Sequence, residues 1–379
     1  MGKKVFILAG ETSSDMLGAY LMDACENLYK IDKWFGIGGP MMIDRGLISS
    51  KNFQILSVIG VSKIFSNIFK LYFLMNELID QVLREKPDYI FTVDTKIFSL
   101  IFALKLQKKM KKLNFKMPII QFVAPSAWAW GKWRISLFER AFDGILCLYP
   151  FEPKMFNKNK INAIFVGHPL SWELKSSKNN QKNRKINLAI FPGSRMTEIK
   201  FHLPLILNIC VKLNELNLIN KIILPTLPEF KDIISKEIKI RKIKNINLFS
   251  RKKLSPNILK TVDLMISSSG TVTLETALLA IPGIVIYHLS LIDKIFVKFF
   301  VNIKTPVLPE IILNQKVYKF FILPNSFEKI LNDIIFLAKN NISEKNNMYK
   351  ISKKLQTVLR TETSDFKQSL KKAIKNMHQ

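Results

Sequence analysis

Short apolar runs bounded by glycine, proline or aspartate recur along the chain, and most are followed by a segment with the spacing of an amphipathic helix. In the first half, this pattern predicts strands at Val5–Ala9, within Trp34–Pro40, and at Tyr89–Val93, Pro118–Val123, Asp143–Leu148 and Ile164–Val166. In the second half, it predicts strands at Ile186–Phe191, Lys221–Leu224, Ile246–Leu248, Val262–Ile266 and Ile284–Tyr287. Strands that alternate with helices are typical of parallel α/β sheets.

A polar segment rich in lysine and asparagine, Lys175–Lys185, separates the two series and has no apolar periodicity. We therefore predict an α/β fold with two Rossmann-like parallel-sheet domains that face each other across a cleft. The predicted boundaries are residues 1–174 for the N-terminal domain, 175–185 for the linker and 186–345 for the C-terminal domain. Residues 346–379 are predicted to form a polar helical tail.

The stretch Ser267–Glu275 places a small polar turn with one glycine between a predicted buried strand and a predicted helix. Such a turn directs main-chain N–H groups toward an anion, so Ser269, Gly270 and Thr271 are candidate ligand contacts. Glu275 lies about one turn into the helix, where its carboxylate can reach a sugar hydroxyl. The alternative interpretation is a capped helix with a capping-box-like glutamate.

Three further turns follow predicted strands in the same way. Glu11 and Asp15 lie after the first strand, at the edge of the sheet where α/β proteins bind ligands, and helix capping is their alternative role. Asp94 directly follows an apolar strand, which suits a general base, and its alternative role is a helix N-cap. Arg195 ends the turn Pro192–Arg195, where its planar guanidinium is placed to clamp a diphosphate.

Length and composition indicate how many domains the chain can form and which kinds of partner it favours. The 379 residues are enough for two domains, and the 48% apolar content is enough for a substantial core. The 58 basic and 29 acidic residues give a formal charge of +29, which favours nucleic acid, anionic membrane or phosphorylated ligands. Codon bias of an AT-rich genome gives the same lysine-rich composition, and no nucleic-acid-binding signature is visible. We therefore expect no nucleic-acid partner.

The three cysteines, Cys25, Cys147 and Cys210, lie far apart, which fits a reducing cytosol without a disulfide framework or a zinc site. We expect no signal peptide, and no transmembrane helix because no run of about 18 apolar residues occurs. Two lysine-flanked aromatic segments, Val61–Leu83 and Leu289–Lys304, are candidate membrane-surface helices. A core-facing helix is the alternative for the first of them.

Two other features have competing interpretations. Trp128 and Trp130 lie in a loop bounded by proline and glycine, where they either seal a core or line a sugar or acyl site. His168 has no second histidine at metal-ligand spacing. We predict a structural hydrogen-bonding role for it at the junction of the domains.

Several motifs together resemble those of the lipid-A-disaccharide synthase family, which are inverting glycosyltransferases with the GT-B architecture. Each motif alone is weakly specific, but the set occurs in the family's order over about three quarters of the chain and is highly specific. The matching motifs are Ala9–Glu11 with Ser13 and Asp15, Pro125–Ser126, Trp128–Trp130, Pro150–Glu152, Gly167–Pro169, Pro192–Arg195 with Glu198, and Ser269–Thr271 with Leu274–Glu275.

The resemblance implies transfer of diacylglucosamine from UDP-2,3-diacylglucosamine to the 6-hydroxyl group of 2,3-diacylglucosamine 1-phosphate, in lipid A (lipopolysaccharide) biosynthesis. The products are the β-1,6-linked lipid A disaccharide 1-phosphate and UDP, and the resemblance implies no cofactor and no metal ion. It also implies a cytoplasmic enzyme, peripheral on the anionic cytoplasmic face of the bacterial inner membrane. The tail then either packs on the N-terminal domain or is exchanged in a homodimer.

The resemblance also implies roles for individual residues. Asp94 is identified as the general base that takes the proton of the acceptor hydroxyl, with Glu11 or Asp15 as alternatives. Arg195 and the N–H groups around residues 269–271 would stabilise the departing diphosphate, and Glu275 would hold the nucleotide ribose. The implied substrate-binding residues are Glu11, Ser13, Asp15, Gly193, Ser194, Arg195, Ser269, Gly270, Thr271 and Glu275.

The sequence departs from the family pattern at three other positions. Ser14 stands where a glycine is usual, Ile97 where a carboxylate is usual after Asp94, and Glu310 where an asparagine is usual. Two alternative functions are another GT-B UDP-sugar transferase or epimerase, and a non-catalytic basic protein that binds anionic membrane or nucleic acid.

Overall fold

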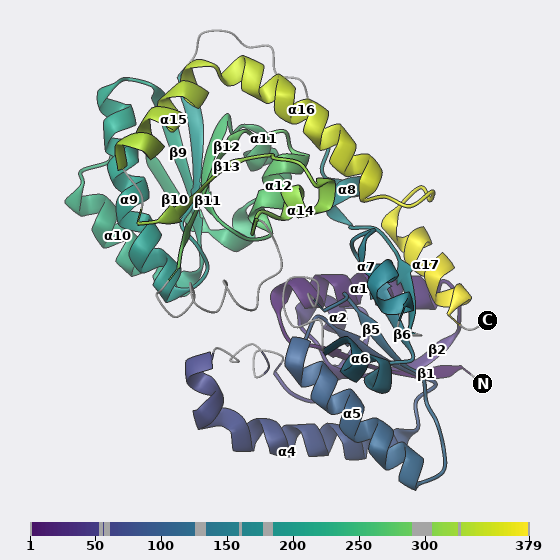
Figure 1. Cartoon of the computed structure of the whole chain (residues 1–379). Coiled ribbons are helices and arrows are strands. Elements are labelled where there is room, and N and C mark those ends of the chain that lie inside the picture. Colours follow the sequence, from purple (N-terminus) through teal and green to yellow (C-terminus); the bar gives the residue numbers. More distant parts are fainter. Residues whose placement is uncertain are drawn as a thin grey trace. The chain divides into compact units, whose positions relative to one another are not determined.

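The computed structural model describes residues 2–52, 56, 61–125, 134–158, 161–176, 185–289, 305–324 and 327–377, and only the main chain of residues 12, 61–68, 96 and 252. The chain divides into two compact units (Figure 1). The first unit comprises Met1–His168 and Leu359–Gln379, and the second comprises Pro169–Val358.

The first unit is built on one parallel sheet. Its strands are β1 (Lys3–Ala9), β2 (Ile31–Ile37), β3 (Leu47–Ser49), β4 (Tyr89–Val93), β5 (Ile119–Phe122), β6 (Gly144–Cys147) and β7 (Asn162–Phe165). Its helices are α1 (Thr12–Glu26), α2 (Pro40–Ile43), α4 (Val61–Glu85), α5 (Lys96–Lys112), α6 (Ile135–Ala141), α7 (Glu152–Asn157) and α17 (Phe366–Asn376).

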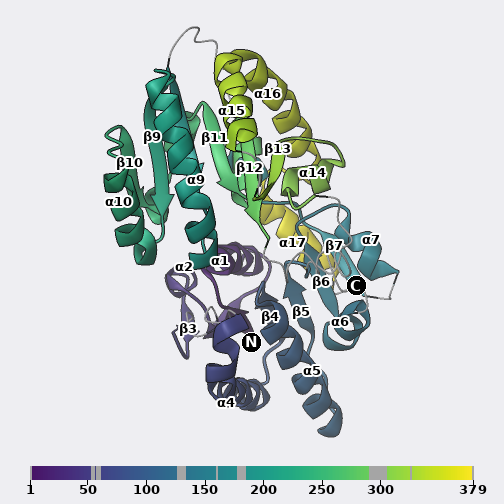
Figure 2. The same ribbon diagram turned by 60° about the vertical axis from the view of Figure 1, so that its left-hand side comes forward.

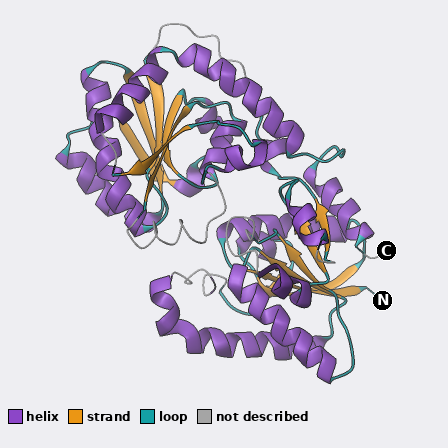
Figure 3. Ribbon diagram, in the orientation of Figure 1, coloured by secondary structure: helices purple, strands orange, loops and turns teal. Residues whose placement is uncertain are grey.

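The strand order of this sheet is β3-β2-β1-β4-β5-β6-β7, so the direction of winding reverses between β1 and β4. Right-handed crossovers on the two sides of such a reversal place helices on opposite faces of the sheet. Helices therefore cover both faces (Figure 3): α1 packs with α2 and α17, and α5 packs with α4 and α6. Because both faces are covered, the central strands are continuous apolar runs, and residues 5–9 of β1 are fully buried.

The second unit repeats this plan. Its strands are β8 (Ile186–Phe191), β9 (Ile219–Thr226), β10 (Ile246–Ser250), β11 (Leu264–Ser268), β12 (Gly283–His288) and β13 (Lys319–Leu323). Its α-helices are α8 (Leu170–Glu173), α9 (Met196–Glu215), α10 (Lys231–Ile240), α11 (Pro256–Lys260), α12 (Val272–Leu278), α14 (Leu308–Leu313), α15 (Phe327–Lys339) and α16 (Asn341–Val358), and its 3-10 turns are η2 (Pro228–Phe230) and η3 (Arg251–Lys253).

The strand order here is β10-β9-β8-β11-β12-β13, with parallel pairing and a reversal between β8 and β11. α9 packs with α10 and α15, whereas α12 packs with α14 and α16, and helices again cover both faces (Figure 2). The core lies between the sheet and α9, where buried isoleucine and leucine side chains such as Ile190, Leu203 and Ile206 form one cluster.

α16 is fastened to the second unit by two buried polar contacts. Lys345 Nζ lies 2.6 Å from a carboxylate oxygen of Asp263, and both side chains are largely shielded from solvent. Further along the helix, Ser352 Oγ donates to the carbonyl oxygen of Leu278 over 2.6 Å. These contacts fix α16 beside α12, so the helix is an integral part of the second unit.

α17 belongs to the first unit, although it follows the second in sequence. Phe366 at its start is buried and contacts the rings of Tyr20 and Phe122 at centroid distances of 5.5 and 6.4 Å. Lys367 adds an ion pair with Asp23 over 2.7 Å. The compact units thus divide residues 346–379 between them, whereas the sequence pattern groups these residues as one tail.

The α/β class and the two parallel sheets predicted from the sequence are confirmed. Strands β4 and β8 have the predicted bounds, whereas β11 begins and ends later than predicted, so that Ser267 and Ser268 are buried strand residues. The pattern misses β3 and β13. Both lie at the edge of a sheet, β3 has 3 residues, and Lys319 and Ile322 of β13 are exposed.

We expect Phe366→Ala to lower the free energy of unfolding of the first unit by about 3–5 kcal/mol, because it empties a buried aromatic site between α17, α1 and β5. Urea denaturation measures this change. Phe336→Ala is the matched control, since Phe336 on α15 is 52% exposed and its loss should change the free energy by less than about 0.5 kcal/mol. Equal effects of the two substitutions would contradict the packing of α17.

Candidate active site

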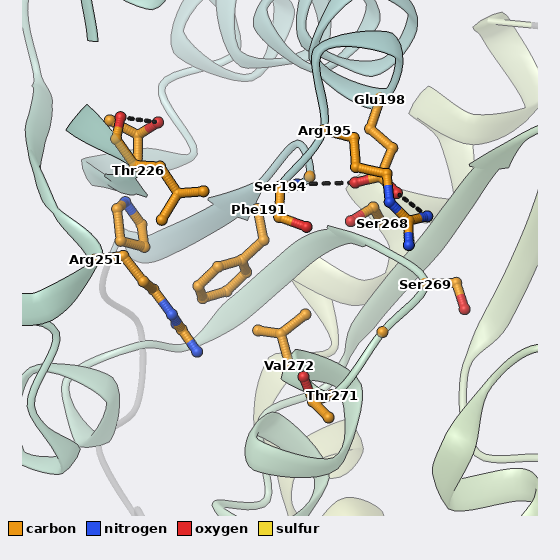
Figure 4. Close-up of a pocket in the computed structure, with 14 residues that line it drawn as sticks. Phe191, Ser194, Arg195, Glu198, Thr226, Arg251, Ser268, Ser269, Thr271 and Val272 are labelled. Carbon is orange, nitrogen blue, oxygen red and sulfur yellow. Dashed lines mark hydrogen bonds and ion pairs between the residues drawn. The ribbon is translucent and has the colours of Figure 1, made fainter. Parts of the chain in front are cut away.

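A cavity of about 270 Å³ opens in the second unit where the strand order reverses. It lies at the carboxyl ends of β8 and β11, the edge at which open α/β sheets bind ligands. Figure 4 shows side chains from several segments around it. The lining residues are Phe191, Gly193, Ser194, Arg195, Glu198, Pro225, Thr226, Leu227, Arg251 and Ser268–Val272.

The turn after β8 is shaped by Gly193 and Glu198. Gly193 has a φ of +133°, and a Cβ atom at this position would lie 2.4 Å from the Cβ atom of Glu198, so only glycine fits. Glu198 accepts a 2.8 Å hydrogen bond from the main-chain N–H of Ser194 and a 3.4 Å hydrogen bond from Arg195 Nη1. The Arg195 side chain is 73% exposed, so it can turn toward an incoming anion.

A buried histidine, His202, holds the same turn from α9. Its Nδ1 lies 2.8 Å from the carbonyl oxygen of Pro192, and its Nε2 accepts from the N–H of His288 at 3.0 Å. These partners require the neutral ring with the proton on Nδ1. Burial is the main cause that lowers the pKa of His202, which keeps it neutral. His202 thereby ties the turn to the end of β12.

The turn after β11 carries Ser269, Gly270 and Thr271. Ser269 Oγ donates to the carbonyl oxygen of Pro306 over 2.7 Å, so this hydroxyl anchors a neighbouring segment. The side chain of Thr273 donates to the carbonyl oxygen of Gly270 over 2.7 Å and closes the start of α12. The turns predicted from the sequence after β8 and β11 therefore line one cavity.

Glu275 forms an ion pair that the sequence does not reveal. Nη2 of Arg251, on the turn after β10, lies 2.7 Å from both carboxylate oxygens of Glu275. Arg251 lines the cavity, whereas Glu275 is absent from the described residues that line it. The guanidinium carbon of Arg251 also lies 5.8 Å from the ring centroid of Phe191. No local sequence signal marks this arginine, because its partners are brought to it by the tertiary fold.

In the first unit, Asp94 lies at the equivalent reversal, directly after β4. Its φ of 45° is in the left-handed region, which is rare outside glycine and is found at functional sites. The turn after β1 is close by, because a Cβ atom on Gly10 would lie 3.1 Å from the side chain of Thr95. Burial raises the pKa of Tyr149, and the charges of Glu152 and then Asp94 raise it further.

The other predicted residues of the first unit fall into two groups. Glu11 and Ser13 are exposed at the start of α1. Asp15 is buried, and its two oxygens accept hydrogen bonds from the N–H groups of Met41 and Met42 at 3.0 and 3.1 Å. The carboxylate of Asp15 thus holds the start of α2.

The three departures from the family pattern have visible surroundings. Ser14 is buried, and its hydroxyl both accepts from the N–H of Glu11 at 2.7 Å and donates to its carbonyl oxygen at 2.8 Å. Glu310 is buried and accepts from the N–H groups of Val317 and Tyr318 at 3.0 and 3.1 Å. The Ile97 side chain is 51% exposed on α5. Two of the three residues therefore serve local structure.

Other features of the sequence have a less direct connection to the site. Residues 126–133, which include Trp128 and Trp130, lie outside the described residues, as do residues 290–304.

His168 is buried, stacks on Tyr149 at 5.9 Å and donates its main-chain N–H to the carbonyl oxygen of Leu359. Within the described residues, no group of three or more His, Cys, Asp or Glu side chains is arranged to hold a metal ion.

Two doubly wound parallel sheets, each with one reversal of winding, define a protein of the GT-B architecture. Solved structures of this class have the same fold. A UDP-N-acetylglucosamine 2-epimerase from Listeria monocytogenes aligns over 99% of this chain and 95% of its own with a TM-score of 0.62 and 11% identity. MurG from Acinetobacter baumannii aligns over 98% and 99% with a TM-score of 0.59 and 11% identity.

Sequence comparison distinguishes the family within this class. The lipid-A-disaccharide synthetase family profile matches residues 5–375. The lipid-A-disaccharide synthase of Idiomarina loihiensis is 30% identical over 322 residues, 83% of each chain. That of Blochmanniella pennsylvanica is 31% identical over 350 residues, 88% of this chain and 87% of its own. The chain therefore belongs to the lipid-A-disaccharide synthase family, whose role is glycosyl transfer in lipid A biosynthesis.

We expect Gly193→Ala to lower the free energy of unfolding by about 1–3 kcal/mol, because its φ is left-handed and the added Cβ atom would meet Glu198. Gly270→Ala is the matched control on the opposite turn, where a Cβ atom would meet nothing within 4 Å and the change should stay below about 0.5 kcal/mol. Denaturant titration of both variants measures the difference. A Gly193→Ala protein as stable as the control would contradict the shape of this turn.

Proposed function

We propose that the protein transfers diacylglucosamine from UDP-2,3-diacylglucosamine to the 6-hydroxyl group of 2,3-diacylglucosamine 1-phosphate. The hydroxyl oxygen attacks the anomeric carbon of the donor sugar and forms the β-1,6 bond. The bond between that carbon and the diphosphate oxygen breaks, and UDP leaves with the electron pair. The observation that carries this proposal is the cavity at the β8/β11 reversal, in a chain matched almost from end to end by the family.

The cavity suits the nucleotide diphosphate of the donor. The exposed side chains of Ser194 and Arg195 on one turn offer a hydroxyl group and a cation, and the main chain of residues 269–271 on the other turn offers N–H donors to the same space. A guanidinium binds two phosphate oxygens at once, and charge that develops on the leaving diphosphate is stabilised most by donors already in place. Gly193 permits the close turn that this requires, and Glu275 would accept from the ribose hydroxyls.

Asp94 is the proposed general base that takes the proton of the acceptor hydroxyl. Its position at the carboxyl end of β4 and its left-handed backbone support this role. Asp15 is a weaker candidate, because both of its oxygens already accept main-chain hydrogen bonds. Glu11 and Ser13, exposed beside this turn, are then proposed to contact the acceptor.

An exposed apolar patch on the first unit supports contact with a membrane. It comprises Phe69, Tyr72 and Phe73 on α4 with Ile97 and Ile101 on α5, and the two phenylalanines are 75% and 68% exposed. The ammonium group of Lys105 lies 4.2 Å from the ring centroid of Tyr72, so a cation flanks the patch. Aromatic side chains with neighbouring lysines are typical of surfaces that bind anionic lipid. In the described part of the chain, no helix is long and apolar enough to cross a membrane.

We further propose that the protein works on the cytoplasmic face of the bacterial inner membrane, where the patch would meet the acyl chains of both substrates. A homodimer with exchanged carboxyl-terminal helices is the proposed assembly that the family resemblance suggests. Within one chain, α17 packs on α1, and an exchanged dimer would make the same contact with the partner copy. The alternative functions, another UDP-sugar enzyme or a non-catalytic basic protein, are not favoured by the family match.

We expect Asp94→Asn to lower the rate of acceptor-dependent UDP release by about 10²-fold or more, because the variant cannot take the proton of the attacking hydroxyl. A coupled UDP assay with both substrates measures the rate. Asp88→Asn is the matched control, since Asp88 lies at the other end of the same strand and accepts from the N–H of Lys4. Turnover retained in Asp94→Asn would assign the role of general base to Glu11 or Asp15. If the wild type itself shows no acceptor-dependent release of UDP, the proposed reaction is overturned.

We expect the double substitution Phe69→Ser and Phe73→Ser to weaken binding to vesicles that contain anionic lipid by at least about tenfold, because two exposed aromatic rings are lost from the patch. Vesicle co-sedimentation measures the affinity. Phe336→Ser on α15 is the control, with a similarly exposed ring outside the patch. Equal binding by the double variant and the control would show that the patch does not meet the membrane.

A further inference from the structure

Two main-chain positions with left-handed φ angles lie next to each other at the carboxyl edge of the first sheet. Asp94, directly after β4, has a φ of 45°, and Val123, directly after β5, has a φ of 72°. The two positions are neighbours because the register of β4 and β5 pairs Val93 with Phe122. A left-handed φ is a genuine outlier for a β-branched residue such as valine. Such positions persist only where the surrounding structure holds them, and they cluster at active sites.

The buried side chain of Gln121 on β5 is bonded to the main chain at both positions. Its Nε2 donates to the carbonyl oxygens of Phe122 and Val123 at 3.2 and 3.1 Å. The carbonyl oxygen of Phe122 also accepts a 3.1 Å hydrogen bond from the main-chain N–H of Asp94. One carbonyl group therefore joins the amide of Gln121 to the main chain of Asp94.

Thr92 fixes the side chain of Gln121 from the neighbouring strand. The two residues are cross-strand partners, and the Thr92 hydroxyl donates to Oε1 of Gln121. Thr92 and Gln121 are 0% and 4% exposed, so water does not compete for these hydrogen bonds. Two carbonyl oxygens require the amide nitrogen on their side, which leaves the amide oxygen to accept from the hydroxyl. The amide is thereby held in one orientation with both of its polar ends satisfied.

We infer that Gln121 is a positioning residue that holds Asp94 in place for proton transfer. The inference rests on the proposed function, in which Asp94 is the general base. A general base must lie within hydrogen-bond reach of the proton that it takes, and a displacement of about 1 Å can lower a rate by about 10²-fold. The Gln121 amide fixes the carbonyl group to which the Asp94 N–H is bonded, so it acts on the base through the main chain.

A purely structural role is the alternative for Gln121, because a buried amide that bonds to the main chain also stabilises the sheet. The two roles lead to different expectations for the reaction rate. A positioning residue changes kcat only while Asp94 acts as the base. A structural residue changes the amount of folded protein whichever residue stands at position 94.

A double-mutant cycle of Gln121→Met and Asp94→Asn tests the inference. Methionine has a similar length to glutamine but carries no amide. We expect Gln121→Met to lower kcat for acceptor-dependent UDP release by about tenfold or more, with little change in the KM for the donor, because the base is displaced. In the Asp94→Asn background, the same substitution should change kcat by less than about twofold, because no base is left to position.

Gln107→Met is the matched control. The amide of Gln107 on α5 donates to the carbonyl oxygen of Ala141, which precedes β6 and so lies toward the opposite edge of the sheet. This variant should keep kcat within about twofold of the wild type. Thr92→Val removes the hydroxyl that fixes the amide, and it should lower kcat by about threefold or more. The Thr92→Val cycle with Asp94→Asn carries the comparison if Gln121→Met does not fold.

The outcomes separate this inference from the proposed function. Equal losses of kcat from Gln121→Met in both backgrounds would show that Gln121 acts independently of Asp94 and would overturn the inference. A loss in Asp94→Asn with full activity in Gln121→Met would also overturn it, and the proposed function would stand. If Asp94→Asn retains turnover, the proposed base fails and the inference fails with it. If the wild type shows no acceptor-dependent release of UDP, the proposed reaction itself fails.

Discussion

The reversal of winding in a parallel sheet is the constraint on which the rest of this structure depends. Where two neighbouring strands send their connections to opposite faces, no helix covers their carboxyl ends, and the turns that follow them are free to meet a ligand. Each sheet has one such reversal, between β1 and β4 and between β8 and β11. Asp94 follows a strand at the first reversal, and Arg195 and Thr271 follow strands at the second. The reversals thereby bring residues that are far apart in the sequence to the carboxyl edge of each sheet.

Buried and half-buried polar side chains then fix the shape of the turns at these edges. His202 and Glu198 hold the turn after β8, Ser269 is tied to Pro306, and Asp15 holds the start of α2. Each of them pairs with a main-chain group, and the buried His202 and Asp15 satisfy groups that would otherwise lack partners. The proposed function assigns the contacts with substrate to more exposed groups such as Arg195. Glu198, Ser269 and Asp15, which all belong to the matched motifs, thus hold main-chain groups of the protein in place.

Much of this arrangement is predictable from the sequence. The central strands are continuous apolar runs, so β4 and β8 are found with their bounds, and the ordered motifs locate both reversals. The edge strand β3 is not predicted because its 3 residues, Leu47–Ser49, are too few to form a recognisable apolar run. The role of Arg251 is not predictable for another reason. Its ion pair with Glu275 joins residues 24 positions apart, and no local sequence pattern indicates that pair. The hydrogen-bond partners of the Asp15 carboxylate are unpredictable in the same way, because the fold brings the N–H groups of residues 41 and 42 to it.

The placement of α17 has a consequence for the order of folding. The second unit is one continuous stretch, Pro169–Val358, whereas the first unit needs α17 from beyond that stretch. During synthesis, domains tend to fold as they emerge, so the second unit can close while the first still lacks a helix. Until then Tyr20 and Phe122 have no Phe366 to pack against, and an apolar surface on the earliest part of the chain is open to chaperones. The first unit therefore begins to be synthesised first and is completed last.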